Sequence, residues 1–107
     1  MLCETGGVAA SKDHLSWTFL TNHAHVLLAI AAEPQIRLRE IAERVGITER
    51  ATHRIVTELG EAGYLTVVKE GRRNTYTVVR DRPLRHPAEQ HHRIGELLKV
   101  LSHRSAR

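Results

Sequence analysis

Cysteine and long apolar runs are scarce in this chain of 107 residues. Cys3 is its only cysteine, so no intrachain disulfide can form and a secreted disulfide scaffold is excluded. No apolar run approaches the roughly 20 residues that cross a bilayer. The N-terminus also lacks the basic start and apolar block of a signal peptide. We therefore expect a cytoplasmic protein with no membrane partner.

Aromatic residues and catalytic motifs are also rare. Aromatic side chains make up 4% of the sequence, so its core must be built from Leu, Ile, Val and Ala. The length suits one small domain. No glycine-rich phosphate loop, nucleophile elbow or HExxH motif is present, and no cysteine cluster could make a thiolate metal site. We expect no enzymatic activity, no cofactor and no thiol-based redox sensing by Cys3.

Positive charge is in excess but unevenly spread. The formal net charge is +4 and the pI about 9.8, which favours a polyanionic partner. Residues 48–79 carry five Lys/Arg against four Asp/Glu, whereas residues 80–107 carry seven against three. Binding to nucleic acid would therefore depend on a few well-placed side chains rather than on a strong general field.

Three helical patterns follow a loose tail over residues 1–15. The first covers Thr21–Ala32, capped by Thr21 or Asn22 and ended at Glu33-Pro34, and residues 35–38 lead on as a short extended piece. A second helix, Arg39–Val45, is followed by Gly46-Ile47-Thr48 and a third helix to Ala62, stopped by Gly63. This tight break predicts a helix-turn-helix, whose second helix can enter a DNA major groove.

The third helix has two distinct faces at 100° per residue. Its predicted core side consists of Ala51, Ile55, Leu59 and Ala62. Arg50, His53 and Thr57 lie opposite, with Arg54 at the margin.

Two β-branched runs, Leu65–Glu70 and Thr75–Val79, then flank a loop over residues 71–74 and predict a β-hairpin. Leu65 and Val67 should face inward from one strand, and Tyr76 and Val78 from the other. Lys69, Arg72 and Arg73 lie at its tip.

The C-terminal quarter predicts a last helix. Residues 82–87 form a proline-bounded linker, and Pro87 suits the first turn of a helix over residues 88–101, before a frayed tail at 102–107. An apolar stripe runs along this helix at Ile94, Leu97, Leu98 and Leu101. The stripe either folds back onto its own domain or pairs with a second subunit.

Together these elements resemble the winged helix-turn-helix module of bacterial MarR-type and ArsR-type regulators. The resemblance covers roughly residues 20–80, and its most specific parts are IAERVGIT, the pattern L-x-x-A-G-Y-L and the wing sequence G-R-R-N-x-Y. It implies a mainly α fold with a small β-hairpin wing, in the order α-β-α-α-β-β-α, forming one domain over residues 16–81.

The resemblance also implies a function. The chain would bind double-stranded DNA sequence-specifically as a bacterial transcriptional regulator, with a recognition helix at 48–62 in the major groove. A wing at 69–76 would reach the adjacent minor groove or backbone. The expected DNA-binding residues are Thr48, Arg50, Thr52, His53, Arg54, Thr57, Lys69, Arg72, Arg73 and Asn74. A homodimer would form through Ile94, Leu97, Leu98 and Leu101. No small-molecule effector can be identified from the sequence.

Two other functions stay open at this level. Winged helices also serve as protein-docking modules that do not bind DNA. The eight histidines invite an ArsR-like metal-responsive regulator, but their spacing is poor for a shared ion. His23 and His25 point about 200° apart on a helix, so a site would need ligands from two helices or two subunits. No metal ligands are therefore assigned.

Overall fold

The helix α1 (Asn22–Ala32) opens the fold in a computed structural model that describes residues 16–101. The hydroxyl of Thr21 caps it by accepting a hydrogen bond from the Ala24 N–H, 3.3 Å away, as predicted. Val26, Leu27, Ala29 and Ile30 are buried along one face of this helix. The predicted tails at 1–15 and 102–107, and Cys3, lie outside the described residues.

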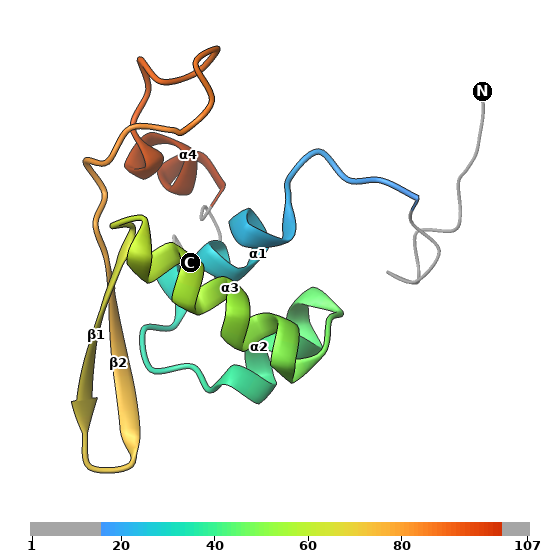
Figure 1. Ribbon diagram of the computed structural model, residues 1–107, viewed down its shortest axis with the longest axis vertical. Coiled ribbons are helices and arrows are strands. Elements are labelled where there is room, and N and C mark those ends of the chain that lie inside the picture. Colours follow the sequence, from blue (N-terminus) through green and yellow to red (C-terminus); the bar gives the residue numbers. More distant parts are fainter. Residues whose placement is uncertain (1–15, 102–107) are drawn as a thin grey trace.

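The helices α2 (Leu38–Val45) and α3 (Glu49–Glu61) form the predicted helix-turn-helix (Figure 1). Gly46 ends α2 in a left-handed conformation, with φ at 88°. A residue with a side chain would be strained in this conformation, which is why glycine is favoured there. The Thr48 hydroxyl then caps α3 by accepting from the Ala51 N–H at 3.0 Å. These two local signals fix the break between the helices.

The strands β1 (Leu65–Glu70) and β2 (Arg73–Val78) pair in antiparallel register from Leu65 opposite Val78 to Glu70 opposite Arg73. The predicted hairpin is confirmed, but its loop is shorter than expected. Only Gly71 and Arg72 form the turn, whereas Arg73 and Asn74 belong to β2. Gly71, with φ at 64°, supplies the left-handed conformation that such a tight turn needs.

The inward-facing pattern of the wing is confirmed only at its base. Leu65 and Tyr76 are buried, and Val78 is half-buried. Val67 was predicted to face inward, yet 48% of its surface is exposed. The reason is visible in Figure 1, where the hairpin extends past the three helices and leaves its outer part uncovered.

The short extended piece predicted at 35–38 is not a strand. Leu38 is the first residue of α2, Arg37 before it has an extended backbone, and Pro34 and Gln35 form a turn. A single backbone hydrogen bond, from the Tyr76 N–H to the Pro34 carbonyl at 2.8 Å, joins this turn to β2. The winged-helix fold class is confirmed, with the element order α-α-α-β-β-α.

The last helix, α4 (Ile94–Leu101), begins six residues later than the predicted start at Ala88. Pro87 lies in a turn rather than at a helix start. The backbone before α4 makes hydrogen bonds across a loop instead of along a helix. The Leu84 N–H donates to the His92 carbonyl at 3.0 Å, and the Ile94 N–H donates to the Arg82 carbonyl at 2.8 Å. These bonds join the two ends of the 82–94 segment, so α4 cannot start earlier in it.

The apolar stripe of α4 folds back onto its own domain. Ile94 and Leu98 are buried in the same core as α1 and α3, and Leu97 packs against that core. Ile94 and Leu98 are therefore not available as the dimer surface for which they were predicted. Only Val100 and Leu101 leave substantial apolar surface exposed on this helix.

Candidate nucleic-acid interface

The outer face of α3 carries the side chains that were predicted to read DNA. Arg50, His53, Arg54 and Thr57 are all exposed, while Ile55 and Leu59 hold the opposite face in the core. The buried side follows from the 3.6-residue period, which places residues 55 and 59 on the same face. Thr48 is also exposed at the helix start, where its hydroxyl serves as the cap.

Thr52 is a correction to the predicted DNA-binding set. Its surface is 0% exposed, and its hydroxyl donates to the Thr48 carbonyl at 2.9 Å. At 100° per residue Thr52 lies only about 20° from Leu59, which places it on the core side of α3. The hydrogen bond satisfies the buried hydroxyl, so this residue stabilises the helix and cannot reach a base.

Arg54 shares a carboxylate with a histidine from another helix. Glu58 lies one turn further along α3, with Oε2 at 3.4 Å from Arg54 Nη1 and Oε1 at 2.7 Å from His23 Nε2. The hydrogen bond with His23 and, less strongly, the charge of Arg54 lower the pKa of Glu58. The i,i+4 spacing of Arg54 and Glu58 allows their pairing to be predicted, whereas no sequence pattern indicates the contact with His23.

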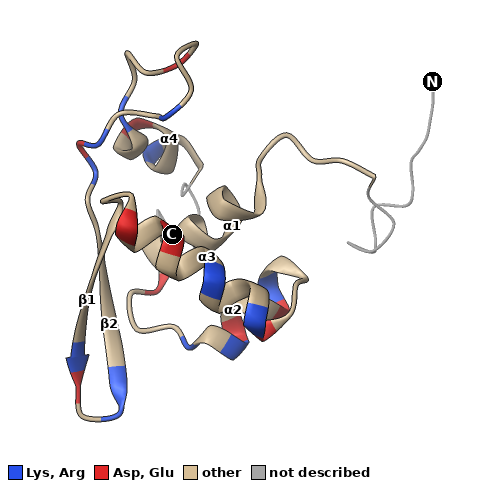
Figure 2. Ribbon diagram, viewed as in Figure 1, with Lys and Arg blue, Asp and Glu red and all other residues tan. Residues whose placement is uncertain are grey.

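The wing presents its basic side chains near the turn. Arg72 is in the turn, Arg73 starts β2, and Lys69 pairs in register with Asn74. The three cationic residues are exposed and Asn74 is half-buried. Figure 2 shows basic positions on both strands at this end of the hairpin and again at the start of α2.

A groove of about 390 Å³ lies between α3 and the wing. His53 and Thr57 line it from the helix, and Val67 and Asn74 from the strands. The structure therefore brings three of the predicted residues, His53, Thr57 and Asn74, to one depression. Gly60 also lines it and adds no side chain to fill the space.

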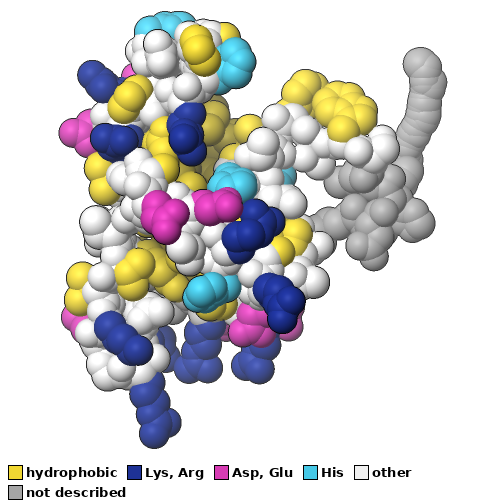
Figure 3. Space-filling view, viewed as in Figure 1, with side chains coloured by type: hydrophobic (Ala, Val, Ile, Leu, Met, Phe, Trp, Pro, Cys, Tyr) yellow, Lys and Arg dark blue, Asp and Glu magenta, His cyan; other side chains and the backbone are white. Residues whose placement is uncertain are grey.

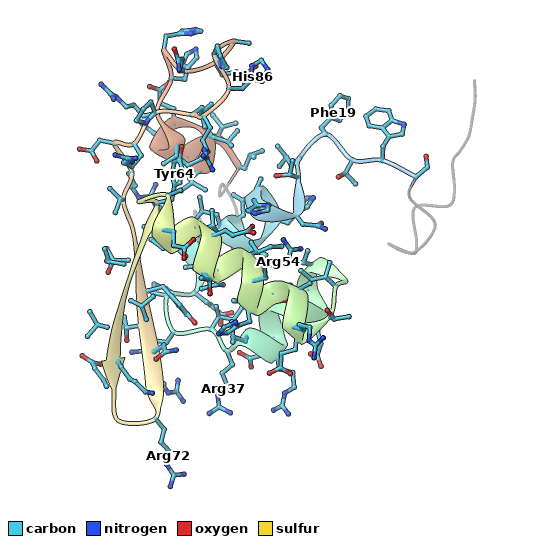
Figure 4. The ribbon with its side chains drawn as sticks, in the orientation of Figure 1. Phe19, Arg37, Arg54, Tyr64, Arg72 and His86 are labelled. Carbon is cyan, nitrogen blue, oxygen red and sulfur yellow. The ribbon has the colours of Figure 1, made fainter. Side chains whose placement is uncertain are left out.

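A larger cleft of about 910 Å³ lies between the start of α2, the start of α3 and the wing. Arg37 and Arg39 line it from the α2 side, facing Arg72 and Arg73 of the wing. Arg37 and Arg39 were not among the predicted residues, because the charge of residues 1–47 is nearly balanced and no periodic pattern distinguishes them. Figure 4 shows Arg37 and Arg72 projecting toward the same end of the molecule.

The histidines of residues 16–101 form no group of three or more His, Cys, Asp or Glu that could hold a metal ion. Those near α4 have local partners instead. His86 Nδ1 accepts from the Ala88 N–H at 3.0 Å, and His92 Nδ1 lies 2.5 Å from Glu96 Oε1. Residues 16–101 therefore contain no set of ligands that would support a metal-responsive regulator. The same residues contain no helix long and apolar enough to span a membrane.

Comparison with known proteins identifies the domain. Residues 21–66 match the profile of a family described as winged helix-turn-helix DNA-binding, and this range runs from the cap of α1 into β1. Over this range the chain is similar to winged helix-turn-helix DNA-binding domains. The match confirms the predicted resemblance to a winged helix-turn-helix module, and it agrees with the predicted fold class.

Two solved structures similar to this winged-helix chain are of the PcaV transcriptional regulator from Streptomyces coelicolor. The first, in complex with its natural ligand, is 32% identical, covers 56% of this chain and 45% of the PcaV chain, and has a TM-score of 0.49. The second is also 32% identical, covers 55% and 46%, and has a TM-score of 0.48. The chain thus spans less than half the length of PcaV. No curated protein matches the chain.

Proposed function

We propose that this protein binds double-stranded DNA sequence-specifically as a transcriptional regulator. The recognition helix α3 enters the major groove, and the wing contacts the adjacent minor groove or its backbone. The observation that carries the proposal is the exposed outer face of α3, with Arg50, His53, Arg54 and Thr57, beside a wing that bears Arg72 and Arg73. The domain match over residues 21–66 supports it.

Each exposed side chain on α3 suits a known type of contact. An arginine can pair with guanine O6 and N7 through two hydrogen bonds, and a threonine can contact a thymine methyl group. The wing arginines suit the negative potential of a narrow minor groove. Glu58 and Glu61 lie on the same exposed half of the helix and limit its positive field. Sequence preference therefore rests on the few arginines rather than on general attraction.

Selection of bound sequences from random duplex DNA tests the proposal and reports the site. Arg50→Ala and Arg54→Ala should then each weaken binding to the selected duplex by roughly five- to 150-fold, because a good base contact is worth about 1–3 kcal/mol. Arg85→Ala is a matched control. Arg85 is equally cationic and exposed, but lies in the 82–94 segment, at the opposite end of the molecule from the wing turn (Figure 1). Unchanged affinity in both α3 variants would overturn the recognition-helix assignment.

We also propose that the protein acts as a homodimer. Exposed apolar side chains at both ends of the described chain support this. Trp17 and Phe19, whose rings lie 5.0 Å apart, are 69% and 91% exposed, and Val100 on α4 is 71% exposed. Neighbouring exposed apolar groups such as the Trp17 and Phe19 rings often mark a surface that contacts another protein. A two-fold dimer would match half-sites about 34–36 Å apart.

Sedimentation tests the dimer. Val100→Glu should yield monomers, because a charge would be buried at the contact. Val68→Glu is the control, since Val68 is similarly exposed but lies on the wing. If the Val100→Glu protein still sediments as a dimer, α4 is not the interface.

A further inference from the structure

A histidine from α1 lies beside the outer face of the recognition helix α3. His23 Nε2 is 2.7 Å from Glu58 Oε1, and Glu58 Oε2 is 3.4 Å from Arg54 Nη1. These side chains are open to solvent, with 44% of His23, 45% of Glu58 and 62% of Arg54 exposed. Figure 3 shows histidine, acidic and basic side chains side by side over the middle of α3, and Figure 4 shows Arg54 on that helix. A group that can gain a proton is thus linked to an arginine that is proposed to contact DNA.

Glu58 shares its carboxylate between a permanent cation and a titratable group. The hydrogen bond with His23 lowers the pKa of Glu58, so the carboxylate is ionised and accepts a hydrogen bond from the His23 Nε2–H. While His23 is neutral, the charges of Arg54 and Glu58 cancel. A second proton, on Nδ1 of His23, turns the short contact into an ion pair. His23 then neutralises Glu58 in place of Arg54, and the three side chains together carry a net positive charge.

Glu58 is the charged group in contact with His23. Residues 16–20, which lead into α1, contain no charged side chain. The elements that pack against α1 carry further charged residues, which are Arg39, Glu40, Glu43 and Arg44 of α2, Glu49, Arg50 and Glu61 of α3, Arg73 of β2, and Glu96 and Lys99 of α4. Within residues 16–101, none of these forms a hydrogen bond or an ion pair with His23. The charge of His23 is therefore felt first by Glu58 and, through it, by Arg54.

Two more histidines belong to α1 and α3. His25 is about 200° from His23 around α1, so it points away from Glu58. His53 is exposed on the outer face of α3 and lines the groove beside the wing. A proton on His53 would also attract DNA, so its contribution must be separated from that of His23.

We propose that His23 makes DNA binding stronger at acidic pH, by pairing with Glu58 when protonated and so releasing Arg54 to the duplex. This inference rests on the proposed function, because it requires DNA at the outer face of α3. Histidine side chains gain their charge between about pH 8 and pH 5. Over that range the positive charge next to the duplex grows as the pH falls, and by linkage the bound duplex favours uptake of the proton. The protein would therefore respond to acid without a separate effector.

Titration of the selected duplex with the full chain at about pH 7.5 and about pH 5.5, at one salt concentration, tests the inference. The His53→Gln protein serves as the reference, because it lacks the other histidine of α3. Its affinity should rise on acidification by roughly two- to fivefold, the size expected for one exposed charge that is screened by water and salt. Adding His23→Gln, which keeps a hydrogen-bond donor but cannot be charged, should abolish the rise. Adding His86→Gln, at the opposite end of the molecule from the wing turn (Figure 4), should leave it unchanged.

Two further variants separate the release of Arg54 from the added charge alone. Glu58→Gln in the reference protein leaves Arg54 without its ion pair at both pH values. This protein should bind more tightly than the reference at the higher pH and gain less on acidification. His23→Gln in the wild-type chain should reduce the rise without abolishing it, because His53 remains. Circular dichroism at both pH values should show all variants folded.

The outcomes distinguish this inference from the proposed function. If the duplex is bound but the rise is absent from the reference, or survives His23→Gln, DNA binding stands and the role of His23 is wrong. An equal loss of the rise with His86→Gln overturns that role too, because the net charge of the protein would then explain it. A full gain in the Glu58→Gln protein contradicts the release of Arg54. If the wild-type chain binds no duplex at either pH, the proposed function and the inference both fail.

Discussion

His23 on α1 and Glu58 on α3 lie within hydrogen-bond distance, with 2.7 Å between Nε2 and Oε1. The contact joins two helices across 35 residues of sequence and places an imidazole beside the exposed face of the recognition helix. The other carboxylate oxygen of Glu58 faces Arg54. Arg54, which is expected to contact DNA, is thus paired with Glu58, whose negative charge would repel DNA.

Replacing Glu58 by Gln should strengthen DNA binding. The change removes a negative charge next to the duplex and releases Arg54 from its ion pair. A gain of up to roughly fivefold is expected, since the interaction between exposed charges a few ångströms apart is weakened by water and salt. Fluorescence anisotropy with the selected duplex would measure it.

Glu89→Gln supplies the control for that gain. Glu89 lies in the segment between β2 and α4. Its described hydrogen bonds are made by its backbone, whose N–H donates to the His86 carbonyl and whose carbonyl accepts from the His92 N–H. The two variants change the net charge equally, so a gain of the same size in both would mean that Arg54 plays no part. Weaker binding by the Glu58→Gln protein would contradict the prediction outright.

Two carboxylates should make stability depend on pH in the acid range. Hydrogen bonds with His23 and His92 lower the folded-state pKa values of Glu58 and Glu96 below the ordinary 4.5. The unfolded chain therefore binds protons more readily. The stability from these groups is present above about pH 4.5 and is lost as the pH falls through their folded-state pKa values.

Thermal unfolding between about pH 6 and pH 3 would measure this effect. The Glu58→Gln/Glu96→Gln variant has no such groups to titrate, so its melting temperature should fall less steeply over the same range. Equal slopes for the variant and the wild type would show that other carboxylates dominate. Glu89→Gln, whose side chain has no described partner, should behave like the wild type.

Thr52 should affect stability and not DNA affinity. Thr52→Val keeps the shape of the buried side chain but removes the hydrogen bond to the Thr48 carbonyl. The valine places a methyl group next to that carbonyl, so we expect unfolding to become easier by about 1 kcal/mol. Denaturant titration measures the loss. If the folded Thr52→Val protein bound the selected duplex much more weakly, Thr52 would belong to the DNA-binding surface after all.

Sequence predicted the helix-turn-helix well because its signals are local. Thr21, Gly46 and Thr48 mark helix ends by their own backbone and side-chain chemistry, and the structure has them in those roles. The fold class followed from their order. The exposure of Arg50 and Arg54 on α3 followed from the 3.6-residue period alone, which the packing of Ile55 and Leu59 obeys.

The errors arose where distant contacts decide the outcome. Residues 88–93 have a helical pattern, but hydrogen bonds from Leu84 to His92 and from Ile94 to Arg82 join the two ends of the 82–94 segment. The stripe of α4 has the same spacing whether it meets its own core or a partner, so the pattern could not choose between them. Arg37 became a candidate only when the wing was found opposite to it.

Two glycines in helices should respond oppositely to alanine. In α3, a Cβ at Gly60 would come no closer than 3.9 Å to its nearest neighbour, the Leu65 carbonyl oxygen. Gly60→Ala should therefore stabilise the protein by about 0.5–1 kcal/mol through helix propensity. In α4, a Cβ at Gly95 would lie 2.9 Å from both Cβ and O of Arg80. Gly95→Ala should cost about 1–3 kcal/mol, because that backbone must move.

Thermal unfolding of the Gly60→Ala and Gly95→Ala proteins measures the opposite changes in stability, since 1 kcal/mol shifts the melting temperature of a domain this size by about 4–8 °C.

Gly63→Ala is a useful third case, because φ at Gly63 is 90° and the Arg82 guanidinium lies close. It should also destabilise, for reasons of backbone conformation as well as space. A Gly95→Ala protein that melts at or above the wild-type temperature would mean that α4 does not pack against Arg80 as described. The fold-back of its apolar stripe onto the core would then be in question as well.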